Sequence, residues 1–377
     1  MWTCALLVSA ALATVAGREV AARLQGELVV GGLFAVHGAA EAGAGGCGTR
    51  VREHYGIQRV EAALLTLRRL RMDADAVRLG AELRDSCWAP HTALRQALAL
   101  VRQSCGTADG TAPLLGVLGP GASAAAAQVQ NLLQLFSVPQ VSYSATAREL
   151  SDRARFSTFF RVVPPDTRQA RVLLALLKAH NWTYVHAIYT DGSYGQSGIA
   201  VFRELAAAEG VCVAREEALR AEPTDDVSEC VCVRVCVCGR TVRAVLAGVG
   251  RGGGGRLRLV GSDGWADRGD VVQDREAAAR GSLTVKIRSP TLAYFDDYYT
   301  SLRPHHNADN PWFKVRQPSL MGRSHGAILV DQLRNRSFNK IDLVVLRERV
   351  TNIHPSIHTI HTINFRVYNM YCCNIEF

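Results

Sequence analysis

The sequence predicts an α/β protein made of two lobes, each a parallel β-sheet covered by helices. Short apolar runs alternate with longer amphipathic stretches from about residue 27 to residue 144, and the alternation restarts after "RVVPPDT". Since consecutive parallel strands are joined by helical crossovers, this alternation is typical of parallel sheets with helices on their faces. The chain has 377 residues, which is enough for two domains of about 100–200 residues each.

The first series supplies the elements of the first lobe. Four runs are predicted as strands: "ELVVGGLFAV", "RLGAEL", "LLGVLGPG" and "PQVSYS". Three stretches are predicted as helices: "YGIQRVEAALLTLRRL", "HTALRQALALVRQ" and "SAAAAQVQNLLQLF". In the first helix, Val60, Ala63, Leu64 and Leu67 recur at helical spacing, so they are expected to form one buried face.

The second series follows Pro164 and Pro165, which interrupt the pattern and predict a hinge. Its predicted helices are "RQARVLLALLKAHN", "GQSGIAVFRELAAAEG" and "RTVRAVLAGVG", and its predicted strands are "TYVHAIYT", "VCVARE", "CVCVRVCVCG" and "RLRLVGSDGW". From about Lys314 the composition shifts to Asn, Ile, His and Tyr without a clear β/α rhythm. No fold is predicted for that tail.

Composition argues against a nucleic-acid-binding protein. The formal net charge is +9, but the basic residues are mostly arginines scattered along the chain and rarely interleaved with aromatic residues. A nucleic-acid interface would instead concentrate them on one face.

The N-terminus and the cysteines indicate an exported protein. Residues 1–17, "MWTCALLVSAALATVAG", predict a signal peptide, although they lack a basic start and a short buried helix is the alternative. Eleven cysteines fit an oxidising compartment. Asn181 in "NWT" and Asn335 in "NRS" are candidate glycosylation sites. No later apolar run reaches the length of about 18 residues that a transmembrane helix needs, so the chain as given is expected to be soluble outside the cell.

Two predicted helix starts could hold a ligand. Thr146 and Glu149 have the spacing of a capping box. Gly119 and Gly121 permit a tight turn before Ser123, which can cap the next helix, and free N–H groups there would attract an anion. Both lie where open α/β sheets bind ligands, at the carboxyl ends of strands.

Further polar residues suggest a small zwitterionic ligand. "GSDGWADR" offers Asp263 and Arg268, and "TDGSYGQSG" offers Tyr194. Carboxylates pair with ammonium groups, arginines bind carboxylates, and an aromatic face attracts a cation.

Metal binding and catalysis are not predicted. Cys230 and Cys232, like Cys236 and Cys238, would share one face of a strand, and local disulfides or burial are favoured over zinc. No Ser/His/Asp set, catalytic carboxylate pair or Walker-type loop has a convincing context. The sequence therefore predicts neither an enzyme nor a cofactor.

Several long segments resemble the metabotropic glutamate receptors, class C G-protein-coupled receptors, and are closest to the group I subtypes. They are "REHYGIQRVEA", "LRDSCW", "QVQNLLQLFSVPQVSYSATARELSD", "FFRVVPPDTRQAR", "NWTYVHAIYTDGSYGQSG", "VCVCGRTVRAVL", "GSDGWADR", "FDDYY" and "NPWF". The resemblance implies an extracellular, bilobed Venus flytrap of the type I periplasmic-binding-protein class. Residues 18–164 would form lobe one, 165–288 lobe two and 289–313 a return to lobe one, with 314–377 a divergent tail and lobe one incomplete.

The resemblance also implies an amino-acid site. Three residues match positions that bind the α-carboxylate and α-amino groups of the ligand: Ser123, Ser144 and Thr146. Three more match positions around its α-ammonium group: Asp166, Tyr194 and Asp263.

The distal end of the ligand is implied to face a different set of residues. Tyr55 and Arg59 match residues near the distal carboxylate, and their i, i+4 spacing agrees with a shared role. Arg268 matches a second-lobe arginine near the ligand. The family's distal lysine would lie beyond residue 313, where the resemblance stops.

The cysteines have implied roles as well. Cys47 and Cys87 match a lobe-one disulfide, and Cys105 lies near the cysteine that links two protomers. Cys236 and Cys238 are expected to form disulfides, with the pairing among residues 230–238 left open.

The implied function is reception of L-glutamate or a related amino acid. Ligand would stabilise the closed lobes, and a homodimer would pass closure through a cysteine-rich domain to membrane helices and a G protein, both beyond this chain. The expected location is the extracellular side of the plasma membrane, or outside the cell if the chain is complete as given. Three alternatives stay open: a secreted decoy that binds amino acids, a non-functional truncated product, and an enzyme on the same fold.

Overall fold

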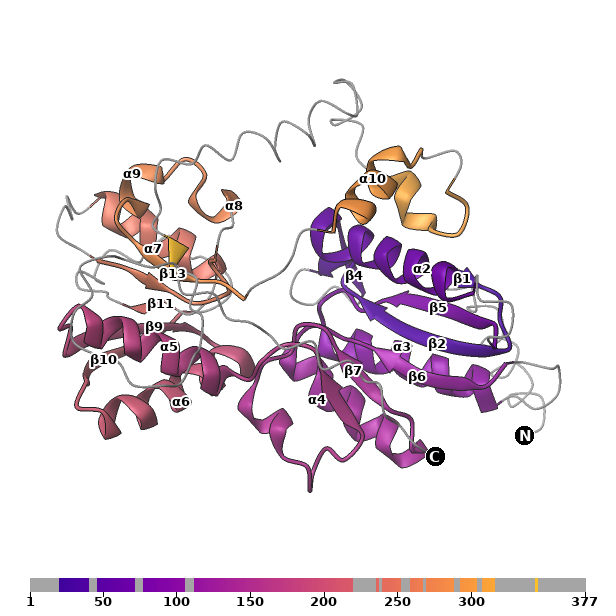
Figure 1. Ribbon diagram of the computed structural model, residues 1–377, viewed down its shortest axis with the longest axis horizontal. Helices are drawn as coiled ribbons and strands as arrows, with labels where there is room; N and C mark the ends of the chain where they lie inside the picture. Colours follow the sequence, from indigo (N-terminus) through magenta and orange to yellow (C-terminus); the bar gives the residue numbers. More distant parts are fainter. Residues whose placement is uncertain are drawn as a thin grey trace, which may run out of the picture. The chain divides into compact units, whose positions relative to one another are not determined.

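The computed structural model describes residues 20–40, 46–71, 77–105, 112–219, 235–236, 239–251, 258–266, 269–287, 292–303, 307–315 and 343–344. The described residues fall into two compact units (Figure 1). Unit 1 contains those up to Ser144, Ser157–Phe160 and those from Ala293 to 315. Unit 2 contains Ala145–Phe156, the described part of Arg161–Leu292, and 343–344. The predicted signal peptide lies outside the described residues, and the lobe boundaries drawn from the sequence remain predictions.

Unit 1 is built on a six-stranded sheet in the order β1-β5-β2-β6-β7-β8. The central strands β5, β2, β6 and β7 run parallel, whereas β1 pairs with β5 in the antiparallel sense. The strands are β1 (Ala21–Leu24), β2 (Leu28–Phe34), β5 (Leu79–Asp85), β6 (Leu114–Leu118), β7 (Gln140–Ser142) and β8 (Phe159–Arg161). The four apolar runs predicted as strands thus form the parallel core of this sheet.

Helices α2 (Gln58–Leu70), α3 (Pro90–Cys105) and α4 (Ser123–Leu133) pack against the sheet of unit 1. The predicted face of α2 is confirmed for Val60, Leu64 and Leu67, which are buried. Facing side chains of β2, α3, β6 and α4 form a common apolar core, and it contains Leu33, Ala93, Ala97, Leu100, Val101, Val117, Ala125, Val129 and Leu133. Burying such side chains is the main force that fixes the helices to the sheet.

A hairpin extends from this sheet. Strands β3 (His37–Ala39) and β4 (Cys47–Val51) pair in the antiparallel sense, and β4 leads into a π-helical turn, η1 (Glu53–Ile57), that runs directly into α2. A disulfide joins Cys47 of the hairpin to the buried Cys87, which follows β5.

The chain returns to unit 1 near its described end. Helix α10 (Ala293–Ser301) and the short η4 (Pro311–Val315) belong to unit 1, and α10 packs against α2 (Figure 1). Two buried aromatic side chains, Trp312 and Phe313, anchor η4.

Unit 2 is a second six-stranded sheet in the order β10-β9-β11-β12-β13-β14, and each neighbouring pair of its strands is parallel. Its strands are β9 (Tyr184–Thr190), β10 (Cys212–Leu219), β11 (Val235–Cys236), β12 (Val260–Gly261), β13 (Leu283–Val285) and β14 (Leu343–Val344). Its helices are α5 (Asp166–Ala179), α6 (Ser193–Ala208), α7 (Gly239–Arg251), α8 (Gly269–Val272) and α9 (Glu276–Ala279). The predicted α/β class is therefore confirmed, and β14 adds a strand from the region for which no fold was predicted.

Apolar faces of α5 and α6 close one side of the unit 2 sheet. Leu173, Leu177 and Phe202 pack with Val185 and Ala187 of β9 in one buried cluster. A second cluster contains Val242, Val245 and Leu246 of α7. Among the described residues, no helix combines the length and the apolar content needed to cross a membrane.

Candidate functional site

The predicted site residues fall in both units. Four lie in unit 1: Tyr55, Arg59, Ser123 and Ser144. Four lie in unit 2: Thr146, Asp166, Tyr194 and Asp263. Arg268 lies outside the described residues, as do Cys238 and Asn335.

In unit 2 the structure joins Tyr194 to Asp263. Tyr194 lies in the first turn of α6, after β9, and Asp263 follows β12, so both come from carboxyl ends of parallel strands. The Tyr194 hydroxyl donates a hydrogen bond to Asp263 Oδ1 at 2.6 Å. Burial and the Asp263 carboxylate raise the pKa of Tyr194 well above its usual value, so the hydroxyl stays protonated and remains a donor.

Asp166 is the second carboxylate of this group. It is the first residue of α5 and only 3% exposed, and its N–H donates to the carbonyl of Thr146 at 2.9 Å. Burial raises its pKa to about 6, while the hydroxyls of Thr146 and Ser197 lower it, the Asp263 charge raises it and Arg161 lowers it. Neither carboxylate oxygen of Asp166 has a well-formed hydrogen bond among the described side chains.

Arg161 offsets only part of this negative charge. Its guanidinium donates to the carbonyls of Ala147, at 3.0 Å, and Ala145, at 3.4 Å, and to the Ser151 hydroxyl. Those acceptors occupy much of its hydrogen-bonding capacity. Two carboxylates beside a tyrosine hydroxyl therefore form an electronegative site suited to an ammonium group.

In unit 1, Arg59 lies against an aromatic stack. Its guanidinium carbon is 4.7 Å from the centre of the Tyr143 ring, which stacks on Phe34 at 5.3 Å. The Tyr143 hydroxyl donates to the Leu33 carbonyl at 3.1 Å. Since planar arginine groups stack on aromatic faces and bind carboxylates, this arrangement holds Arg59 in one orientation. Tyr55 lies one turn earlier in η1.

The serines of unit 1 surround the turn between β6 and α4. Gly119 has a φ of +86°, and a Cβ on Gly121 would lie 2.9 Å from the Tyr143 ring, so both positions require glycine. Ser123 is the first residue of α4 and 5% exposed. The Ser144 N–H approaches the Ser142 hydroxyl at 3.5 Å.

Both predicted side-chain caps are wrong. A short 3₁₀ turn begins at Arg148, its cap is Ala147, and no side chain caps it. The buried Thr146 hydroxyl lies near Asp166 instead. Likewise Ala122, not Ser123, precedes α4 and no side chain caps that helix.

Ser197 and Arg161 were missed from the sequence. Ser197 lies three residues after Tyr194 on α6, and its hydroxyl accepts the Arg148 N–H at 2.9 Å. Helical i, i+3 spacing from Tyr194 is the signal that could have identified it. Arg161 carried no such signal, because its partners are two backbone carbonyls and the Ser151 hydroxyl.

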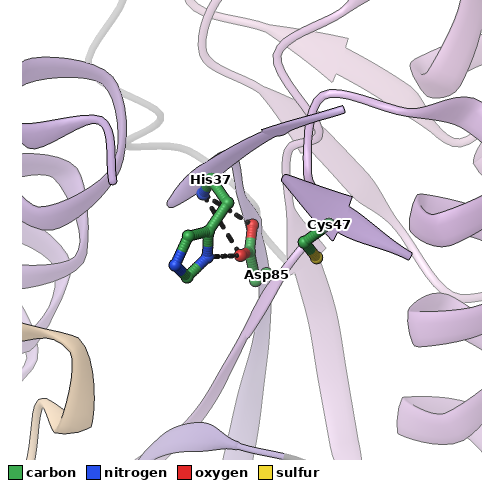
Figure 2. Close-up of side chains that lie close together, drawn as sticks. All are labelled: His37, Cys47 and Asp85. Atoms are coloured by element: carbon green, nitrogen blue, oxygen red, sulfur yellow. Dashed lines mark hydrogen bonds and ion pairs between the residues drawn. The ribbon is translucent and has the colours of Figure 1, made fainter. Parts of the chain in front are cut away.

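His37, Cys47 and Asp85 lie together in unit 1, as Figure 2 shows. His37 Nδ1 is 2.6 Å from Asp85 Oδ2, and Asp85 Oδ1 accepts the N–H groups of Val36 and Cys87 at 2.9 and 2.8 Å. The Cys47 sulfur is bonded to Cys87, so it offers no thiolate to a metal. This group therefore braces the hairpin.

Two remaining predicted residues lie at the ends of helices. Asn181 is exposed in the turn after α5, and Cys105 is the last residue of α3. Glycosylation at Asn181 and pairing of Cys105 between protomers stay predictions. Cys236 lies in β11, and nothing further is described for its side chain.

Comparisons with known proteins agree with this architecture. Residues 58–330 match the family described as the receptor family ligand binding region, which has a type I periplasmic-binding-protein-like fold. The chain is 35% identical over 329 residues to a metabotropic glutamate receptor of Drosophila melanogaster, an alignment that covers 78% of this chain and 33% of that receptor. The chain thus spans about a third of the length of this relative. The predicted resemblance to the extracellular region of metabotropic glutamate receptors is confirmed, and the chain belongs to the family of receptor ligand-binding regions.

Proposed function

We propose that this chain binds L-glutamate or a closely related amino acid as the extracellular ligand-binding region of a class C receptor. The observation that carries the proposal is the electronegative group in unit 2, where Asp166, Tyr194 and Asp263 come together. The Drosophila melanogaster protein to which this chain is similar is a metabotropic glutamate receptor. The matched family consists of receptor ligand-binding regions and is not an enzyme family.

Each end of the ligand has a proposed partner. The α-ammonium group pairs with the carboxylates of unit 2, whose negative charge Arg161 offsets only in part because its guanidinium donates to backbone carbonyls. Ser123, Ser144 and Thr146 supply hydroxyl and N–H donors to the α-carboxylate. Arg59, held on Tyr143, receives the distal carboxylate together with Tyr55.

The proposed mechanism is a change in the equilibrium between open and closed arrangements of the two units. A ligand shifts such an equilibrium only through better affinity for one arrangement. An amino acid has an ammonium group for the unit 2 residues and carboxylates for the unit 1 residues, so it gains most when it contacts both. In the full-length receptor, closure would be passed to membrane helices and a G protein.

Binding of L-glutamate is expected to raise the melting temperature of the purified chain. At a free concentration 100 times the dissociation constant, stabilisation is about 2.7 kcal/mol. Thermal denaturation with increasing L-glutamate measures it, and D-glutamate is the control because it carries the same charges in the wrong configuration. Equal effects of both enantiomers, or none, would contradict the proposed function.

We also propose that two copies associate through α3 and α4 of unit 1. These helices pack side by side. Large apolar side chains are exposed on α3, at Leu94 and Leu98, and just after α4, at Leu135 and Phe136. Exposed apolar side chains on adjoining helices are typical of association surfaces.

The double substitution Leu94→Glu/Leu98→Glu is expected to weaken self-association at least about 10-fold, since each buried leucine contributes about 1.5–3 kcal/mol. Sedimentation velocity under reducing conditions, which exclude a Cys105 bridge, measures the effect. The control is Val77→Glu, another exposed apolar residue of unit 1, 53% exposed and outside α3 and α4. Unchanged association of the double variant would exclude this surface.

A further inference from the structure

A buried polar network ties α2 to the returning segment of unit 1, although more than 200 residues separate them in sequence. Its centre is Glu61, which is fully buried on α2. Glu61 accepts hydrogen bonds from the Tyr298 hydroxyl of α10 at 2.8 Å and from the side-chain amides of Asn307 and, at 2.7 Å, Asn310. A buried carboxylate is tolerated only when it is hydrogen-bonded in this way, so these partners fix where α2 lies.

Tyr298 extends the network along α2. Its hydroxyl also accepts a hydrogen bond from Arg68 Nη1 at 2.9 Å, and Arg68 pairs with Asp309. Burial and the Glu61 carboxylate raise the pKa of Tyr298 to about 12, so its hydroxyl remains a donor to Glu61 at physiological pH.

The neighbouring tyrosine of α10 contacts the start of the same segment. The Tyr299 hydroxyl donates to Glu53 Oε1 at 3.1 Å, and Glu53 is the first residue of η1. The Tyr299 ring is 3% exposed and packs against Phe295 and Phe313. The returning segment therefore contacts this stretch of chain at Glu53 and again at Glu61.

Tyr55 and Arg59 lie between those two contacts. Tyr55 lies in η1, a single π-helical turn that no side chain caps, whereas Arg59 lies in the first turn of α2. The same stretch also packs against the chain just after β2. A Cβ on Gly56 would come within 2.4 Å of Val36 Cα. Contacts from α10 and residues 307–310, together with those to Val36 and Tyr143, thus fix the position of the segment.

We propose that this network is a positioning element for the segment of residues 53–61, which carries Arg59, and that it thereby favours binding of amino acids with a distal carboxylate over neutral ones. Its members are Glu53, Glu61, Tyr298, Tyr299, Asn307 and Asn310. The inference rests on the proposed function, because it deepens the role given there to Tyr55 and Arg59. The network residues act through the segment and touch no ligand themselves.

The test is Tyr298→Phe, which removes one hydroxyl from between Glu61 and Arg68 and keeps the ring. L-Glutamate affinity is expected to fall up to about 10-fold, because the loosened segment spends less time in the arrangement that binds the ligand. L-Alanine has no distal carboxylate for Arg59 to bind, so its affinity is expected to change less than about twofold. Calorimetric titration of both ligands measures the split, and amide hydrogen exchange of residues 53–61 without ligand is expected to accelerate locally.

The matched control is Tyr294→Phe on the same helix. Tyr294 is 47% exposed, and its ring contact with Arg69 survives loss of the hydroxyl. Tyr299→Phe is a milder second variant that keeps the packed ring, with an expected loss for glutamate of about threefold.

The outcomes separate this inference from the proposed function. If wild-type protein binds neither ligand, the proposed function fails and the inference falls with it. If wild-type protein binds glutamate but Tyr298→Phe weakens both ligands equally, or leaves glutamate affinity and the exchange of residues 53–61 unchanged, only the positioning role is overturned. If alanine binds too weakly to titrate, the positioning role is supported by lower glutamate affinity together with hydrogen exchange that is faster only in residues 53–61. Faster exchange throughout unit 1 would contradict the positioning role.

Discussion

Replacing Cys47 and Cys87 by serine is expected to lower the free energy of unfolding by about 4 kcal/mol, from the loop-closure entropy of the unfolded chain. The disulfide closes a loop with a sequence separation of 40 residues. It also ties the hairpin of β3 and β4 to the end of β5, where Cys87 is completely buried. Urea denaturation followed by circular dichroism measures the change, and limited proteolysis reports whether the hairpin detaches first.

The control for this experiment is Cys212→Ser. Cys212 is an exposed free cysteine at the start of β10 in unit 2, and its replacement is expected to change stability by less than about 0.5 kcal/mol. A double variant as stable as the wild type would mean that the bonds of Asp85 to Val36 and His37 suffice to hold the hairpin.

Most strands of the two parallel sheets could be predicted because they are short apolar runs followed by a helical stripe, whereas β13 and β14 were not predicted. Such runs are typical of strands that are covered on both faces of the sheet, as β2 and β9 are. Strand β1 and the β3–β4 hairpin gave no such signal. They are short, partly exposed edge elements, held by pairing to β5 and by a disulfide rather than by a local pattern.

The site shows the same division between local and long-range information. Tyr194 and Asp263 each stood out in sequence, but their hydrogen bond spans 69 residues and no local pattern predicts it. The capping box failed because the Thr146 side chain lies near Asp166 instead of capping the short turn at Arg148. The burial of Glu61 could not be predicted either, because a glutamate on a helix is usually exposed to solvent. Its burial is tolerated only because the returning segment supplies hydrogen-bond donors.

Asp166→Asn is the substitution expected to stabilise the protein while impairing its proposed function. The pKa of Asp166 is raised by burial from 3.8 to about 6, so at pH 7 the folded protein carries a carboxylate that it holds less favourably than the unfolded chain does. The penalty amounts to at most about 3 kcal/mol, and asparagine removes it. Losing the charge that pairs with the α-ammonium is expected to weaken glutamate binding about 10- to 100-fold.

The contribution of Asp166 to the free energy of unfolding is expected to depend on pH. Between pH 6 and 3.8 the folded state binds a proton that the unfolded state does not, so the contribution of Asp166 to stability rises as pH falls and is lost as pH rises through 6. Ligand affinity should change in the opposite direction, because protonation of Asp166 removes the partner of the ammonium group. Urea denaturation and calorimetric glutamate titrations of wild type and Asp166→Asn from pH 4.5 to 7.5 measure both. Parallel stability profiles for the two proteins would show that Asp166 does not titrate there. If the glutamate affinity of the wild type does not change below pH 6, Asp166 does not pair with the ligand's ammonium group.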